Sequence, residues 1–105
     1  MKRTEYHDKY ESLFDLELEK LTQIATKGDA DAQYVLSKRY LEMKDFISSE
    51  IWLTRSREQG NEDAQVGLGF ICALYLNADP SAAISWLARK ESEGETWAAY
   101  HLGLH

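Results

Sequence analysis

Two histidines near the C-terminal end of the chain have the spacing of helical metal ligands. His101 and His105 lie four residues apart, so on a helix both imidazole rings project from one face and suit zinc. No third ligand is evident, and the residues between them lack the glutamate of a metalloprotease motif. The remaining histidine, His7, stands alone near the N-terminus. The sequence therefore predicts no metal site.

The other reactive side chains lack the partners that catalysis requires. Cys72 lies in the apolar run 70–74, which favours a small buried hydrophobic side chain over a nucleophilic thiol. Glu62 and Asp63 are adjacent carboxylates, but they fall in the first turn of a predicted helix, where acidic residues stabilise the helix dipole. No Ser-His-Asp or Cys-His spacing is recognisable. We therefore expect neither an enzyme nor a bound cofactor.

Charged side chains are the next candidates for a binding site. The 105 residues include 18 Asp and Glu against 12 Lys and Arg, and a pI of about 5 argues against nucleic-acid binding, which needs a basic surface. The surplus is uneven: residues 1–57 carry 11 acidic and 10 basic residues, and residues 58–105 carry 7 and 2. The second half includes the acidic run Glu91, Glu93 and Glu95. Such a run is either a solvated face or a means of steering a basic partner.

An internal repeat indicates the helices that carry these side chains. The segment Gly28-Asp29-Ala30-Asp31-Ala32-Gln33 recurs in similar form from Gly60 and again from Gly94. Glycine adopts the left-handed backbone that ends many helices, so we expect a helix to end at each of these glycines. N-cap candidates for the helices that follow are Asp29 or Asp31, Asn61, Thr96, Asp45, and Asp79 before Pro80.

Apolar residues at intervals of four predict the buried faces of these helices. Ala32, Leu36 and Tyr40 form one stripe. The equivalent positions of the next repeat are Ala64, Leu68 and Cys72. Upstream, apolar residues between 13 and 25 predict a helix ending at Gly28. Residues 64–78 carry no charge but are too few to span a bilayer, so we expect them to form the buried centre of the stack.

Because one repeat alone cannot bury its apolar face, the repeats are expected to stack into a single domain. The domain comprises an N-terminal cap helix in residues 1–27, repeats at 28–59 and 60–93, and a truncated repeat at 94–105.

Aromatic residues serve either as core or as contact surface. Trp52 and Trp86 occupy equivalent positions in the two repeats, so we expect them in the core. Trp97 stands where the other repeats have aspartate, and it either packs in the terminal cap or contacts a partner. Tyr34 and Val66 lie beside the buried stripe on the first helix of each repeat, where they either face a groove or pack between repeats. Lys38, Phe70 and His101 lie nearby on the same helices.

The combined pattern of alanine-glutamine, leucine, aspartate, tryptophan and closing glycine resembles the Sel-one-like repeats, relatives of the tetratricopeptide repeat. The resemblance covers residues 28–105 and is most complete between Asp45 and Leu68. It implies an all-α fold, a short α-solenoid of antiparallel helix pairs, and a role in binding other proteins. Two features depart from the family. The usual alanine pair is replaced by Ser56-Arg57 and Lys90-Glu91, which indicates looser packing or exposure there, and the loop glycines are absent.

Length, charge and repeat pattern together predict a protein-protein interaction module. A small acidic chain fits an inhibitor such as a bacterial immunity protein that neutralises a basic toxin, for example a nuclease. The alternative is a regulatory or scaffolding adaptor that binds a peptide or protein in its groove. The residues expected to contact a partner are Tyr34, Lys38, Glu62, Asp63, Val66, Phe70, Glu91, Glu93, Glu95, Trp97 and His101.

The sequence also allows predictions of the cellular compartment and the oligomeric state of the protein. A single cysteine cannot form an internal disulfide, and the first residues show no signal peptide, so we expect a cytoplasmic protein. We expect no direct contact with nucleic acid or membrane. Both a monomer and a dimer are compatible with the pattern, since the apolar ends of a short stack can pair.

Overall fold

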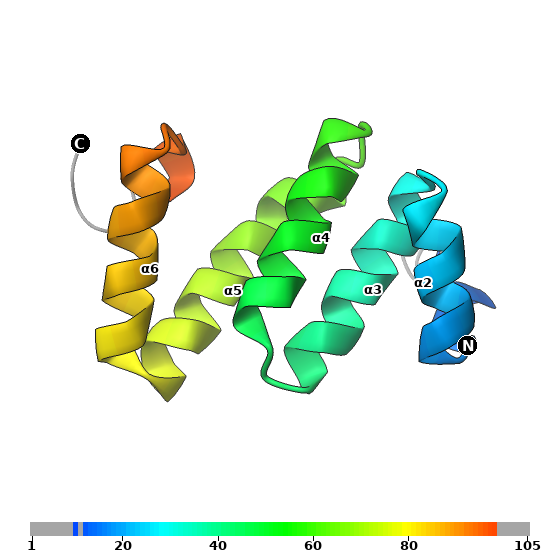
Figure 1. Cartoon of the computed structure of the whole chain (residues 1–105), viewed down its shortest axis with the longest axis horizontal. Coiled ribbons are helices and arrows are strands. Elements are labelled where there is room, and N and C mark those ends of the chain that lie inside the picture. Colours follow the sequence, from blue (N-terminus) through cyan, green and yellow to red (C-terminus); the bar gives the residue numbers. More distant parts are fainter. Residues whose placement is uncertain (1–9, 11, 99–105) are drawn as a thin grey trace, which may run out of the picture. The chain divides into compact units, whose positions relative to one another are not determined.

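Helices and turns make up the part of the chain that the computed structural model describes, which is Tyr10 and residues 12–98 (Figure 1). These residues contain no strand, and the fold is all-α as the sequence predicts. The chain divides into two compact units between Gln65 and Val66. The helices are α2 (Leu18–Thr26), α3 (Ala30–Glu42), α4 (Phe46–Glu58), α5 (Asp63–Ala78) and α6 (Pro80–Ser92). Helix α5 begins in the first unit and continues in the second.

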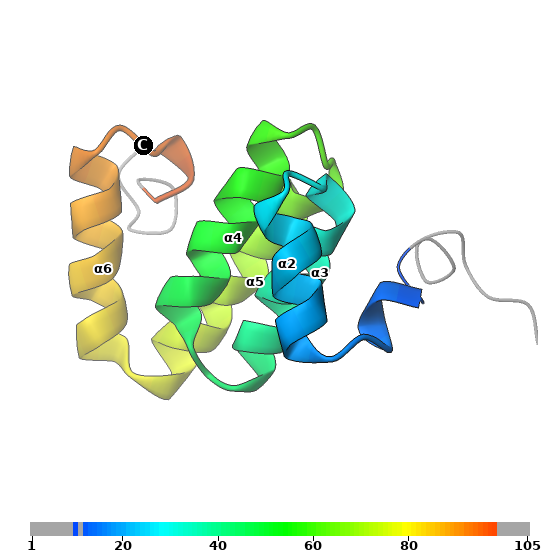
Figure 2. The ribbon, with the colours of Figure 1, turned by 45° about the vertical axis from the view of Figure 1, so that its right-hand side comes forward.

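In the first unit, α2, α3 and α4 pack in succession, each opposite in direction to the one before it (Figure 1 and Figure 2). The short turns between them make consecutive helices neighbours. Asp29 and Asp45 begin α3 and α4, since their carboxylates accept hydrogen bonds from the backbone N–H of Ala32 (2.9 Å) and Ser48 (3.1 Å). Asp45 is confirmed as a predicted N-cap, and of the two alternatives Asp29 and Asp31 the structure shows Asp29 as the cap, with Asp31 inside the first turn of α3. The core of this unit includes Leu21, Ala25, Ala32, Val35, Leu36 and Leu53.

Two buried serines bring the backbones of α3 and α4 close together. The Ser49 hydroxyl donates to the carbonyl of Ser37 at 2.7 Å, and the Ser56 hydroxyl donates to the carbonyl of Ala30 at 2.7 Å. Ser56 is fully buried. The small hydroxyl side chain of Ser56 therefore fits between the two helices and bonds across the interface. The neighbouring Arg57, whose long charged side chain was expected to loosen the packing or to lie exposed, is half-buried.

Residues with positive φ end the helices as the repeat pattern predicts. Gly28, Gly60 and Gly94 have φ values of 102°, 99° and 93°, in the left-handed region that favours glycine. Lys44 adopts φ 62° in the turn between α3 and α4, which contains no glycine. Helical conformation begins at Thr96 itself, so the predicted N-cap at Thr96 is wrong.

In the second unit, α5 turns into α6 at Asp79. The Asp79 carboxylate accepts a hydrogen bond from the backbone N–H of Ala82 at 3.2 Å, and Pro80 fills the first helical position, as predicted. Aromatic rings from successive segments then pack at a tilt of 48°: the centroid of Trp86 lies 5.4 Å from that of Tyr75 and 5.6 Å from that of Trp97. Other buried side chains of the unit are Leu68, Ile71, Cys72, Ala83 and Leu87.

The N-terminal helix is shorter than the sequence predicts. The apolar residues between 13 and 25 do not form one helix, because residues 15–17 leave helical conformation and α2 begins at Leu18. The Arg39 guanidinium of α3 donates to the Leu16 carbonyl at 2.8 Å and so holds this break. A bond between residues so far apart in the chain is not visible in the local apolar pattern.

Candidate functional site

A hydrogen-bonded cluster centred on Tyr10 joins the start of α5 to the N-terminal segment. The Tyr10 hydroxyl donates to the Asp63 carboxylate at 2.7 Å and accepts from the side-chain amide of Asn61 at 2.9 Å. The Asn61 carbonyl oxygen caps α5 by accepting from the backbone N–H of Asp63 and Ala64, which confirms Asn61 as an N-cap. Burial and the hydrogen bond to Asp63 raise the pKa of the Tyr10 phenol well above its usual value of about 10. Asp63, one of the predicted partner contacts, thus makes contacts within its own chain.

Tyr34 lies beneath this cluster and is not exposed. Its ring centroid is 4.7 Å from that of Tyr10, and only 3% of the residue is accessible to solvent. Lys38 is half-buried and holds its ammonium 5.2 Å from the centroid of the Tyr34 ring. Of the two placements that the sequence left open for Tyr34, the structure shows the packed one. Tyr10, far upstream in sequence, provides the cover.

An exposed apolar stripe runs along α5 in the second unit. Val66, Phe70 and Leu74 are spaced by four residues, and 65%, 57% and 46% of their surfaces are accessible. We call these three residues the α5 stripe. The expectation that residues 64–78 form a fully buried centre is therefore wrong, because one face of the helix is buried while the α5 stripe faces solvent. The buried face is the one predicted from the stripe on α3, namely Ala64, Leu68 and Cys72.

A second exposed apolar stripe lies on the first unit. Met43, Ile47 and Ile51 follow the same four-residue spacing from the turn before α4 into its middle, and they are 53%, 40% and 43% exposed. We call them the α4 stripe. Sequence reasoning did not single out these residues, although their regular spacing was a signal that could have identified them.

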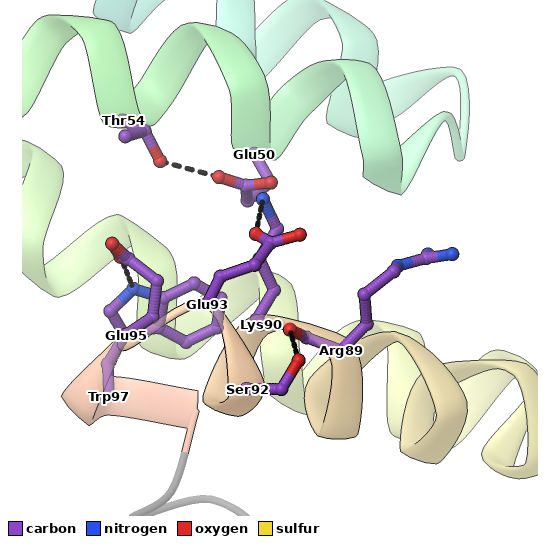
Figure 3. A network of polar contacts seen from close by, with 8 residues as sticks. All are labelled: Glu50, Thr54, Arg89, Lys90, Ser92, Glu93, Glu95 and Trp97. Carbon is purple, nitrogen blue, oxygen red and sulfur yellow. Dashed lines mark hydrogen bonds and ion pairs between the residues drawn. The ribbon is translucent and has the colours of Figure 1, made fainter.

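The predicted acidic contacts separate into exposed and engaged residues. Figure 3 shows two of them, Glu93 and Glu95, with their partners Lys90 and Trp97. Glu62 is exposed one turn before Val66. Glu93 is exposed and pairs with the Lys90 ammonium at 3.5 Å. The Glu95 carboxylate accepts a hydrogen bond from the indole Nε1 of Trp97 at 2.6 Å, and Glu91 is half-buried. Glu62 is thus the acidic side chain that lies in line with an exposed apolar surface.

The tryptophans divide differently from the expectation. Trp97 is 8% exposed and its ring packs at a tilt against Trp86, so it lies within the second unit rather than forming an exposed contact. Trp86 is buried as predicted. Trp52 is only half-buried, and the Arg55 guanidinium lies 4.8 Å from the centroid of its ring. The expected place of Trp52 in the core is therefore wrong.

The remaining candidates provide no second site. His101, His105 and His7 lie outside the described residues, and Cys72 is buried. Within Tyr10 and residues 12–98, no three His, Cys, Asp or Glu side chains come together as metal ligands, and no helix is long and apolar enough to cross a membrane. A hollow beside α2 brings together only polar side chains, namely Glu17, Glu19, Lys20 and Gln23.

Comparison with protein-family models, with curated proteins and with solved structures finds no match to this chain.

Proposed function

We propose that the chain is a protein-protein interaction module and that the α5 stripe is its main contact surface. The observation that carries this proposal is the exposure of Val66, Phe70 and Leu74 along a helix that has no charged side chain from Ala64 to Ala78. Apolar side chains at helical spacing are the anchors that a partner helix or peptide uses. Their burial would contribute roughly 25 cal/mol for each Å² of apolar surface removed from water.

This proposal favours an adaptor over an acidic inhibitor, because it assigns most of the affinity to the α5 stripe and not to the acidic side chains. Asp63 and Glu95 are bonded to Tyr10 and Trp97, so moving them to a partner would break contacts that the folded chain already makes. Val66 and Phe70 are already at the surface, so a partner can cover them without opening the fold. Binding energy at interfaces is concentrated in buried aromatic and aliphatic anchors, which fits Phe70 better than surface carboxylates.

A basic-toxin inhibitor, such as a bacterial immunity protein, is the second candidate. The exposed carboxylate of Glu62 at one end of the α5 stripe favours a partner that carries a basic side chain beside an apolar patch. The excess of 7 acidic over 2 basic residues in 58–105 adds long-range steering toward such a partner.

The family and the compartment are part of the same proposal. Left-handed glycines at positions 28, 60 and 94, each closing a helix at a nearly regular interval, support a Sel-one-like solenoid. A chain with one buried cysteine does not depend on disulfides, which supports a cytoplasmic location. The proposed role needs no catalytic residue and no cofactor.

Capture from a native lysate tests the proposal. Wild-type protein, Phe70→Ser and the matched control Ile84→Ser are immobilised in equal amounts; Ile84 is 51% exposed on α6 and lies outside the α5 stripe. We expect one or more proteins to bind the wild type and the Ile84→Ser variant and to be depleted about tenfold by Phe70→Ser. Circular dichroism checks that both variants keep the wild-type helix content.

The capture experiment can also contradict the proposal. Equal capture by all three proteins would remove the α5 stripe from the proposal. Repeating the capture at increasing salt separates the two candidates, because a complex that depends on carboxylates weakens with ionic strength whereas one that depends on the α5 stripe does not.

A further inference from the structure

The two exposed stripes match each other in length and spacing. The α4 stripe (Met43, Ile47, Ile51) and the α5 stripe (Val66, Phe70, Leu74) each place three apolar side chains at intervals of four residues. In each case a charged side chain continues the row. Arg55 is exposed four residues after Ile51, and Glu62 is exposed four residues before Val66. The helical part of each row, from Ile47 to Arg55 on α4 and from Val66 to Leu74 on α5, is about 12 Å long at the rise of an α-helix, and Met43 and Glu62 extend the rows into the preceding turns.

The charges around the two stripes are complementary. Residues 43–57 carry three basic side chains, Lys44, Arg55 and Arg57, against two acidic ones. One of those acids, Glu50, is 3% exposed, so its contribution to the outer surface is small. Residues 62–79 carry three acidic side chains and no basic one. The chain therefore carries one apolar row that ends in a base and another that ends in an acid.

We propose that the α4 stripe of one molecule docks against the α5 stripe of a second copy of this chain. In an antiparallel arrangement, Arg55 faces Glu62, and the rows then meet in register. The pairs of facing residues are Arg55 with Glu62, Ile51 with Val66, Ile47 with Phe70, and Met43 with Leu74. The antiparallel direction also places the positive N-terminal end of each helix dipole near the negative C-terminal end of the other.

The charge complementarity decides the choice of occupant. A second copy presents the apolar spacing and the end charge that each stripe requires, and both surfaces are described in this structure. Because the two surfaces differ, one copy offers its α4 stripe while the other offers its α5 stripe. One helix face from each copy buries less than the roughly 1,200 Å² of a stable complex, so the association is weak and reversible.

This inference deepens the proposed function, and it rests on that proposal only where it concerns competition. Self-association covers the α5 stripe, so a partner that binds Val66, Phe70 and Leu74 displaces the second copy. At high protein concentration the α5 stripe is then covered by a second copy, which a partner must displace before it can bind. The self-association itself requires no other protein.

Sedimentation equilibrium of the purified full chain tests the docking. A concentration series up to about 1 mM covers weak association. We expect the mean mass of the wild type to rise with concentration above that of the monomer of 12.1 kDa. Ile47→Asp and Phe70→Asp each raise the dissociation constant about tenfold or more, because each places a carboxylate in an apolar contact. Ile84→Asp is the matched control on α6, and it leaves the dissociation constant unchanged.

A charge exchange tests the register. Arg55→Glu alone and Glu62→Arg alone each place like charges opposite one another, so each variant associates more weakly than the wild type. An equimolar mixture of the two variants restores association, because each variant then meets a copy whose facing residue carries the opposite charge. Circular dichroism of each variant confirms that the helices are intact.

Each outcome decides the inference. A wild type that stays at the monomer mass over the whole series overturns it, and capture of a partner then still tests the proposed function separately. Association that none of the stripe variants weakens overturns the assignment of the surfaces. Failure of the mixture to recover overturns the register of Arg55 with Glu62.

Discussion

Tyr10 shows how a single side chain determines which part of the surface is open. Its ring covers Tyr34, and its hydroxyl bonds with Asp63 and Asn61 at the start of α5. The phenol must keep its proton to donate to the Asp63 carboxylate. Ionisation would bury a negative charge beside that carboxylate, which is why the pKa of Tyr10 is raised.

We predict that Tyr10 makes the stability of the protein fall in alkaline solution. Below about pH 10 the phenol is protonated in both states, and its contribution is complete. Above that pH the unfolded chain loses the proton that the folded chain retains, so the free energy of unfolding decreases as pH rises. Urea unfolding between pH 8 and about pH 12 measures this slope.

The matched variants of this prediction are Tyr10→Phe and Tyr40→Phe. Near neutral pH, Tyr10→Phe lowers the free energy of unfolding by about 1.5–3 kcal/mol, because it removes the hydrogen bond to the Asp63 carboxylate. Its stability falls less steeply above pH 10 than that of the wild type, so the two curves converge. Tyr40→Phe retains the steep fall. Parallel curves for the wild type and Tyr10→Phe would contradict this account of the cluster.

At the scale of the helices, local signals predicted most boundaries. Asp29, Asp45 and Asp79 cap the helices that follow them, and the closing glycines have positive φ, because both features depend on residues adjacent in sequence. The break at residues 15–17 could not be predicted in this way. It depends on Arg39 reaching the Leu16 carbonyl from another helix.

Ser56 tests the close approach of α3 and α4. Ser56→Ala removes the 2.7 Å bond to the Ala30 carbonyl and costs about 1 kcal/mol of unfolding free energy. Ser56→Leu costs about 3 kcal/mol, because the fully buried site has no room for the longer side chain. The control Glu58→Leu, on an exposed position of α4, stays within about 0.5 kcal/mol. Chemical denaturation measures all three, and equal effects of Ser56→Leu and Glu58→Leu would contradict the close packing.

At the scale of the whole molecule, the central observation is that α5, which carries no charged side chain after Asp63, has one buried and one exposed face. The sequence predicted the buried face, Ala64, Leu68 and Cys72, from its correspondence with α3. It could not separate the exposed α5 stripe from the core, because Val66, Phe70 and Leu74 are as apolar as the residues that are buried. Hydrophobic periodicity needs a contrast between faces, and α5 offers none.

The sequence likewise predicted some of the exposed contact residues and not others. Val66 and Phe70 are exposed on the expected helix, whereas Tyr34 and Trp97 are covered by aromatic rings. Burial of that kind depends on where Tyr10 and Trp86 lie in space, which neither the composition nor the repeat spacing reports. The α4 stripe shows the converse case, because its regular spacing was present in the sequence.

Photo-cross-linking at position 70 in living cells tests the central claim most directly. A photoreactive phenylalanine derivative replaces Phe70 in one strain and Ile84 in another, and irradiation is followed by immunoblotting and mass analysis of the adducts. We expect specific adducts from position 70, with a partner protein or a second copy identified by mass, and none of these from position 84. An absence of adducts at position 70, or the same adducts at both positions, would contradict the assignment of the α5 stripe as the contact surface.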